Sequence, residues 1–155
     1  MRRNDREITD KKMIEQFIAD EQIVRVAFYD NGDIYIVAVN YGYTLIDDKY
    51  SFYFHGAKAG RKFELSKSKP SVGFEIDGKY KLLEGEKACD FSAAFLSVIG
   101  TGTLQLIEDR DEKIQGLNAI MKQTTKKAEW DYSNEMLEAV AVFRLDVDKM
   151  SCKAK

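Results

Sequence analysis

The chain has 155 residues, 45% hydrophobic and 12% aromatic, so it can bury a core as one domain over residues 1–155, and this composition excludes a disordered chain. A net charge of −2 argues against nucleic acid or an acidic membrane as a partner, because either needs a broadly basic surface. Two cysteines without C-x-x-C spacing and a single histidine predict no metal site. No signal-peptide core or long apolar run occurs, so we expect a reducing cytoplasm.

The first elements in chain order are a helix over residues 9–20 and strands over residues 23–29 and 34–46. Thr9 is a good helix cap, and apolar residues recur after it at helical spacing. Asn31-Gly32 between the two strands is the dipeptide most typical of a tight hairpin. Asn40 and Gly42 interrupt the second strand, which indicates a bulge or a ligand close to the backbone, although a simple bend is equally common.

The next elements are a strand over residues 50–55 and a helix over residues 58–68. The corner between them, residues 55–62, holds the chain's single histidine, two glycines and three cations. The first amides of a helix lack partners and carry partial positive charge, so this corner suits a phosphate. Lys58 is expected to share a helical face with Lys62 and a side with Arg61. By itself, such a cluster of cations is more often a solvated surface.

The rest of the chain predicts strands over residues 71–76, 80–83, 91–107 and 139–147, with a turn at 77–79 and a polar loop at 84–90. Gly100 and Gly102 are expected to bend the longest of these strands around a barrel corner. A helix is expected over residues 109–122, with a buried stripe of Ile114, Leu117, Ile120 and Met121. Residues 126–138 stay ambiguous between a loop and a short helix.

This order of elements predicts a mainly β (α+β) fold. Six or seven antiparallel strands with two to four flanking helices and no βαβ repeat are best explained by a small barrel, since closure removes exposed strand edges.

Three motifs, taken together, resemble the FMN-binding split-barrel superfamily, in its pyridoxamine 5'-phosphate oxidase-like branch that includes nitroimidazole-resistance proteins. In chain order they are residues 36–43 (IVAVNYGY), 53–62 (YFHGAKAGRK) and 97–102 (SVIGTG). The likeness extends from Asp5 to about Asp148. It implies a six-stranded antiparallel split β-barrel with Greek-key-like connectivity, and a homodimer that holds FMN at the subunit interface.

The resemblance also implies which residues bind the cofactor. Val39, Asn40 and Tyr41 would line the flavin ring, with cross-strand packing as the alternative for Tyr41. The remaining expected contacts are His55, Gly56 and Ala57 to the flavin, Lys62 with help from Lys58 or Arg61 to the phosphate, and Ser97 to the phosphate or ribityl chain. The alternatives are a surface charge for Lys58 and a small strand residue for Ser97.

His55 matches a histidine that the nitroimidazole-resistance proteins place beside the flavin, so a catalytic role is implied for it. Because the pKa of an imidazole lies near neutral pH, it can donate or accept a proton while electrons pass through a flavin. A histidine that only hydrogen-bonds the cofactor is an equally good interpretation. The upstream electron donor implied is NAD(P)H, although the chain has no G-x-G-x-x-G fingerprint for a nicotinamide.

The expected function is therefore that of an FMN-dependent oxidoreductase, which reduces a small organic molecule such as a nitroaromatic compound. Two alternatives stay open: a flavin carrier or sensor without turnover, and a haem-binding protein of the same barrel superfamily. For haem, His55 would have to ligate the iron, because the chain has no second histidine.

Overall fold

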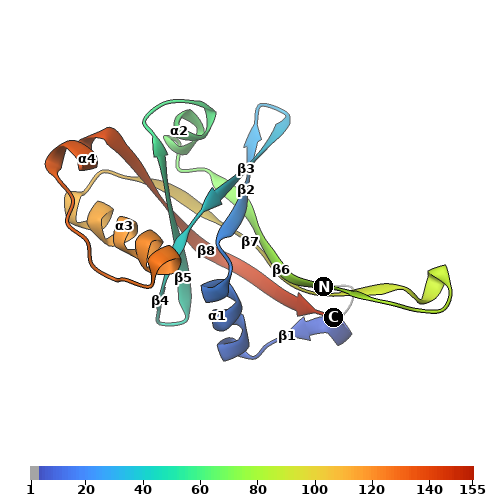
Figure 1. The fold of residues 1–155 in the computed structure, drawn as a ribbon. Helices are drawn as coiled ribbons and strands as arrows, with labels where there is room; N and C mark the ends of the chain where they lie inside the picture. Colours follow the sequence, from blue (N-terminus) through green and yellow to red (C-terminus); the bar gives the residue numbers. More distant parts are fainter. Residues whose placement is uncertain (1–3) are drawn as a thin grey trace.

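The structure, a computed structural model, describes residues 4–155, so residues 1–3 of the predicted domain lie outside it. Antiparallel strands form one extensively curled sheet with helices at its end and on one face (Figure 1). The strands are β1 (Glu7–Ile8), β2 (Ile23–Asp30), β3 (Asp33–Asn40), β4 (Gly42–Ile46), β5 (Lys49–Ala57), β6 (Ser71–Leu83), β7 (Ser92–Ile107) and β8 (Val140–Ala154). The α-helices are α1 (Lys11–Asp20), α2 (Arg61–Ser66), α3 (Arg110–Thr125) and α4 (Asn134–Ala139), and two short 3₁₀ helices span Asn4–Arg6 and Ala88–Asp90.

The strand order in the sheet is β3-β2-β6-β7-β8-β5-β4, and β1 pairs with the outer part of β8. The path is open because β3 and β4, at its two ends, are not paired with each other, although residues of β3 approach β5. This arrangement agrees with a split barrel. The predicted count of six strands is wrong: the described chain has eight, because the interrupted second strand is two strands and a short β1 adds another.

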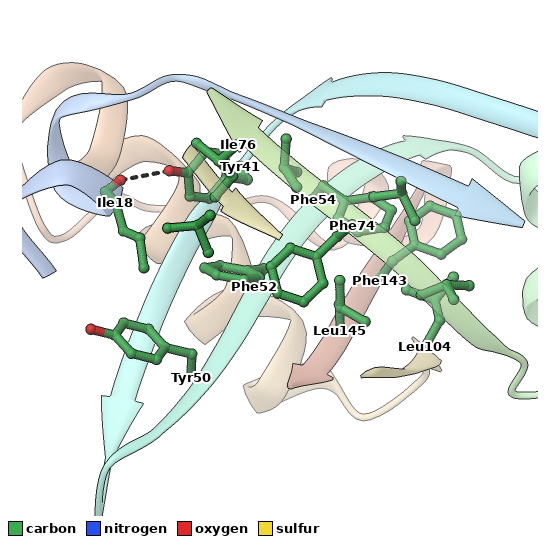
Figure 2. Packing of buried hydrophobic residues seen from close by; sticks show 14 of the residues in the cluster. Ile18, Tyr41, Tyr50, Phe52, Phe54, Phe74, Ile76, Leu104, Phe143 and Leu145 are labelled. Carbon is green, nitrogen blue, oxygen red and sulfur yellow. Dashed lines mark hydrogen bonds between the residues drawn. The ribbon is translucent and has the colours of Figure 1, made fainter. Parts of the chain in front are cut away.

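Aromatic side chains fill the space that the curled sheet encloses (Figure 2). Phe52 of β5 meets Phe74 of β6 edge to face, with ring centroids 5.2 Å apart. Two other strands separate β5 from β6 in the sheet, so this contact crosses the barrel interior. Phe54 stacks on Phe143 of β8 at 5.3 Å, and both rings are fully buried. Burial of such rings supplies most of the favourable free energy of a small barrel.

Helix α3 covers the outer face of β4, β5 and β8 at very short range. Gly42 begins β4 directly beneath α3, and a Cβ at this position would overlap the helix backbone at Ala119. The glycine that interrupts the predicted strand is therefore explained by helix packing. The buried residues of α3 are Lys113, Gly116, Ile120 and Gln123. Of the predicted stripe, Ile120 is buried and Leu117 packs partly buried against the same cluster, whereas Ile114 and Met121 are not among the buried residues.

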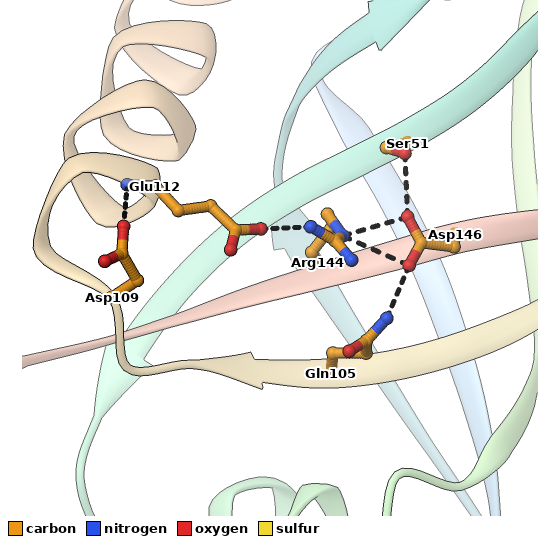
Figure 3. A network of polar contacts seen from close by, with 6 residues as sticks. All are labelled: Ser51, Gln105, Asp109, Glu112, Arg144 and Asp146. Atoms are coloured by element: carbon orange, nitrogen blue, oxygen red, sulfur yellow. Dashed lines mark hydrogen bonds and ion pairs between the residues drawn. The ribbon is translucent and has the colours of Figure 1, made fainter.

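A polar network fastens the start of α3 to the same face (Figure 3). Arg144 of β8 forms ion pairs with Glu112 of α3 and, at 2.9 Å, with Asp146. Asp146 also accepts hydrogen bonds from Ser51 Oγ at 2.8 Å and Gln105 Nε2 at 2.7 Å. Every oxygen of this carboxylate therefore has a partner.

Other predicted boundaries shift for local reasons. Asp10, and not Thr9, caps α1, because its carboxylate accepts from the amides of Lys12 and Met13. The predicted turn at residues 77–79 is wrong: β6 runs on to Leu83 through a bulge, with Lys79 at φ 55°. The closing strand extends beyond Val147 to Ala154, because its last part pairs with β7.

Two further expectations are confirmed in part. The pairing of β7 with β8 shifts register between Thr101 and Gly102, at the glycines expected to bend this strand. The ambiguous segment 126–138 contains the start of α4, capped by the Ser133 side chain. Among the described residues, no helix is both long and apolar enough to cross a membrane.

Candidate functional site

Strand β5 and helix α2 meet at the predicted corner, but the helix begins later than expected. Gly60 is its N-cap with φ 92°, a left-handed backbone conformation that interrupts any helix starting at Lys58. The helix therefore spans Arg61–Ser66 and not residues 58–68. The expected shared helical face of Lys58 and Lys62 is wrong, because Lys58 lies in the connection between β5 and α2. No side chain caps the first amides of α2.

Lys62 turns back from α2 over the end of β5. Its Nζ donates to the His55 carbonyl oxygen at 3.3 Å and lies over the rings of Phe54 and Phe143, 5.4 and 5.0 Å from their centroids. A Cβ at Gly56 would lie 2.9 Å from this Nζ, so the glycine makes room for the ammonium group. Desolvation of the half-buried side chain lowers the pKa of Lys62.

The charge of Lys62 has no carboxylate partner within the described residues 4–155. A carbonyl oxygen and two aromatic faces satisfy an ammonium group only in part, since it has three donors. An anion at this point would supply the missing acceptors. The geometry is thus that of a cation held ready for a negatively charged ligand, next to a backbone made accessible by glycine.

Arg61, next to Lys62 in the helix, is already engaged. Its Nε forms an ion pair with Asp30 Oδ2 at 2.7 Å, and its guanidinium lies 4.9 Å above the ring of Tyr35. Both partners belong to the β2–β3 hairpin, so Arg61 fastens α2 to that hairpin. Because of these contacts, the Arg61 guanidinium is not free to act beside Lys62.

His55 lies on the other face of β5 from Phe54, because successive side chains of a strand alternate. The side chain is exposed at the edge of the α3-covered face. Desolvation, followed by the charge of Lys62, lowers the pKa of His55. The imidazole is therefore predominantly neutral at neutral pH and has both a donor and an acceptor nitrogen.

The predicted residues at the end of β3 divide into inward and outward positions. The Val39 side chain packs against the core, whereas Asn40 is exposed and donates from Nδ2 to the Gln22 carbonyl at 3.2 Å. Tyr41 is fully buried, with its hydroxyl donating to the Ile18 carbonyl at 2.6 Å. Burial raises the pKa of Tyr41 strongly. The Tyr41 ring packs in the core against Phe52 of β5, which agrees with the alternative of cross-strand packing.

Ser97 lies far from the corner within one chain. His55 pairs with Val142, which pairs with Ile107 of β7, and Ser97 lies ten residues further along that strand. At about 3.3 Å per residue this is roughly 33 Å of strand. The Ser97 hydroxyl is buried and has no hydrogen-bond partner among residues 4–155. One chain thus assembles the corner residues, including Gly56 and Ala57, but not Ser97.

Lys113 is a functional candidate that the sequence reasoning missed. It is buried on α3, where it donates from Nζ to the Leu137 carbonyl at 3.1 Å. A signal existed in the sequence: Lys113 lies three, seven and ten residues before Gly116, Ile120 and Gln123, the spacing of one helix face. No group of three or more His, Cys, Asp or Glu side chains in the described part of the chain could hold a metal ion.

Comparisons with known proteins support this fold. The profile of the pyridoxamine 5'-phosphate oxidase family matches residues 10–154. A solved structure from Bacteroides thetaiotaomicron, provisionally named a 5-nitroimidazole antibiotic resistance protein, is 30% identical, with 96% of this chain and 86% of that chain covered and a TM-score of 0.81.

More distant solved structures share the fold. A FAD- and haem-binding protein from Mycobacterium smegmatis is 15% identical, with 97% of this chain and 73% of that chain covered and a TM-score of 0.82. A flavocytochrome from Azotobacter vinelandii is 20% identical, with coverages of 100% and 72% and a TM-score of 0.80. A sequence comparison with curated proteins finds no match.

Proposed function

The chain belongs to the pyridoxamine 5'-phosphate oxidase family of split-barrel proteins, and from this premise we propose that it is an FMN-dependent oxidoreductase. The proposed acceptor is a small organic molecule, with nitroaromatic compounds as the first class to test, and the proposed electron donor is NAD(P)H. The nitroimidazole-resistance name of the Bacteroides protein supports this choice of acceptor. The flavin-binding names of other neighbours support the cofactor class.

One observation carries the proposal: the half-buried ammonium group of Lys62 lacks a carboxylate partner within residues 4–155. A flavin mononucleotide ends in a phosphate, and a charge-assisted contact to it would complete the donors of Lys62. The uncapped amides of α2 lie beside it. The residues at this corner therefore fit the phosphate end of FMN, with Lys62 as its main cation.

A second copy of the chain would complete the site. Asn40 shares the outer face of β2 and β3 with the exposed side chains of Tyr29, Ile34 and Ile36. Exposed apolar groups of this size on one sheet face are typical of a surface that another protein covers. Ser97 lies on the opposite side of β7 from the core residue Val98, although its hydroxyl is buried and has no partner within residues 4–155. In the proposed homodimer, Ser97 of one copy would contribute to the site at the corner of the other.

The chain's own groups then have separate roles. A bound flavin would supply hydride or single-electron transfer. His55, neutral because its pKa is lowered, would accept or donate the proton that accompanies reduction of the acceptor. Lys62 and the amides of α2 would hold the phosphate, and the covering copy would exclude water. The nicotinamide would bind over the flavin, since the chain has no separate nicotinamide motif.

The test begins with FMN titration of the purified protein, followed by anaerobic addition of NADH or NADPH and a screen of acceptors. The proposal predicts tight FMN binding, bleaching by a nicotinamide and reoxidation by a small organic acceptor. FMN binding without bleaching would identify a carrier or sensor. Haem binding without flavin binding would contradict the proposal.

A further inference from the structure

A second cationic position lies on the far side of the corner, where α3, α4 and the β5–α2 connection meet. Lys113 and Lys58 line two adjoining hollows there, of about 380 and 280 Å³. Glu108 lines both hollows as well. The shared lining residues, Lys58, Glu108 and Lys113, place the two hollows next to each other.

Lys113 is only 9% exposed, which is unusual for a charged side chain. Its Nζ donates to two carbonyl oxygens at the end of α4, Leu137 at 3.1 Å and Val140 at 3.5 Å. An ammonium group has three donors, so one remains for the hollow. Desolvation first, and then the charge of Lys58, lowers the pKa of Lys113, although the charges of Glu108 and Glu138 act in the opposite direction.

Neither lysine forms an ion pair with a carboxylate within residues 4–155. The remaining charges around the hollows are Arg110, Glu108 and Glu138. Three cations and two carboxylates line this space, and Arg110 also reaches Asp111 at 3.7 Å outside the lining. The two lysines, which lack ion pairs, therefore supply the local positive charge, and this suits one small anion better than a doubly charged group.

The inner hollow has apolar walls that Phe63 of α2, Leu106 and Ile107 of β7, and Ala141 of β8 provide. A small apolar body would fit against these walls with its charged end toward the lysines. We propose that the hollow between Lys58 and Lys113 binds a small monoanionic organic carboxylate. This site differs from the proposed phosphate position, because Lys62 lines neither hollow.

Carboxylate binding at this site would not require bound flavin. The site also gives Lys58 a different role from the expected one. The sequence reasoning assigned Lys58 to help with the FMN phosphate, whereas its position places it in the space shared with Lys113. Phe63 of α2 lines the inner hollow and Lys62 lines neither hollow, so a bound carboxylate would lie near the corner without occupying the phosphate position.

The test uses benzoate as the probe, titrated into the full chain and followed by backbone amide NMR shifts, with and without FMN. Benzamide, a neutral molecule of the same shape, is the control ligand. We expect benzoate to shift amides of residues 108–113 and 134–140, and benzamide to shift them only at much higher concentration. Inorganic phosphate should bind this site more weakly than benzoate.

Variants connect the binding to the lysines. Lys58→Ala should weaken benzoate binding about tenfold, the value of one charge-assisted contact, and Lys58→Arg should retain most of it. The control Lys67→Ala, an exposed lysine paired with Glu64, should leave the affinity unchanged. Benzoate binding that Lys58→Ala leaves intact, equal binding of benzamide, or shifts that disappear only in Lys62→Met would each overturn the proposal.

Discussion

Two cations on opposite faces of β8, Arg144 of that strand and Lys62 of α2, have opposite surroundings. Arg144 and the preceding Phe143 point to opposite faces of β8. On the α3 side, Arg144 is paired with Glu112 and Asp146, which have their own partners in the network of Figure 3. On the α2 side, Lys62 lies over Phe143 and, among residues 4–155, donates to the His55 carbonyl oxygen alone.

The difference in ion pairing distinguishes a cation that holds the fold together from a cation that could bind a ligand. A part-buried cation whose donors are used fixes two elements relative to each other, and its removal leaves carboxylates unpaired. A part-buried cation with unused donors adds little to the fold and keeps its charge available. This comparison supports a structural role for Arg144 on the α3 face, and it supports the proposal that the α2 corner binds an anion.

The largest expected effect is on the α3 face. Gly42→Ala would force the backbone of α3 away from β4 and should lower the free energy of unfolding by about 3 kcal/mol. The matched control is Gly73→Ala, where a Cβ would meet Ala27 Cβ at an ordinary 3.8 Å. Urea unfolding of both variants measures the difference. Equal stabilities would contradict the close approach of α3 to β4.

The next effect concerns the paired cation. Arg144→Met should destabilise the fold by about 1–3 kcal/mol, because Glu112 and Asp146 would lose charge-assisted contacts while still half-buried. Glu112→Gln combined with Arg144→Met in a double-mutant cycle should show coupling between the two residues. Additive effects in this cycle would show that the ion pair contributes nothing measurable.

A smaller effect is expected at the single histidine, whose signals are readily assigned by NMR. His55 should titrate below about 6.5, the ordinary value, because desolvation and then the Lys62 charge lower its pKa. Lys62→Met should raise this midpoint, whereas Lys67→Met should not. A midpoint at or above 6.5 in the wild-type protein would contradict the described position of the imidazole.

The same shift has a consequence for stability. The pKa of His55 is lower in the folded than in the unfolded chain, so the unfolded chain takes up a proton more readily as the pH falls through about 6.5. The free energy of unfolding should therefore decrease over this range. His55→Asn should remove that part of the pH dependence, which thermal unfolding at several pH values can measure.

Elements that depend on residues close together in the chain could be predicted from the sequence. The Asn31-Gly32 hairpin between β2 and β3 is confirmed, because the turn residues and flanking strands are adjacent in the chain. The mainly β class followed from the order of the elements, and the family followed from the resemblance of three motifs at their spacing. The reason for Gly42 lay beyond the sequence reasoning, because the helix that crosses it comes about 77 residues later.

Local reasoning failed in a similar way at the candidate site. The spacing of Lys58, Arg61 and Lys62 by three and four residues suggested one cationic helix face. The left-handed Gly60 starts the helix only at Arg61, so Lys58 lies outside it. The Arg61 partner, Asp30, belongs to a hairpin distant in sequence, so its pairing could not be predicted from local spacing. Lys62 lies in α2 as predicted and forms no ion pair with a carboxylate among residues 4–155.

Lys62 is proposed to bind the phosphate of a flavin mononucleotide. The direct test is the FMN dissociation constant of Lys62→Met against wild type, with Lys67→Met as control and unfolding curves to confirm that each variant is folded. Loss of one charge-assisted contact worth about 1.5–3 kcal/mol predicts an affinity about 10- to 150-fold weaker in Lys62→Met and no change in the control. Equal FMN affinity in folded wild type and Lys62→Met, or no FMN binding by the wild-type protein, would contradict the account.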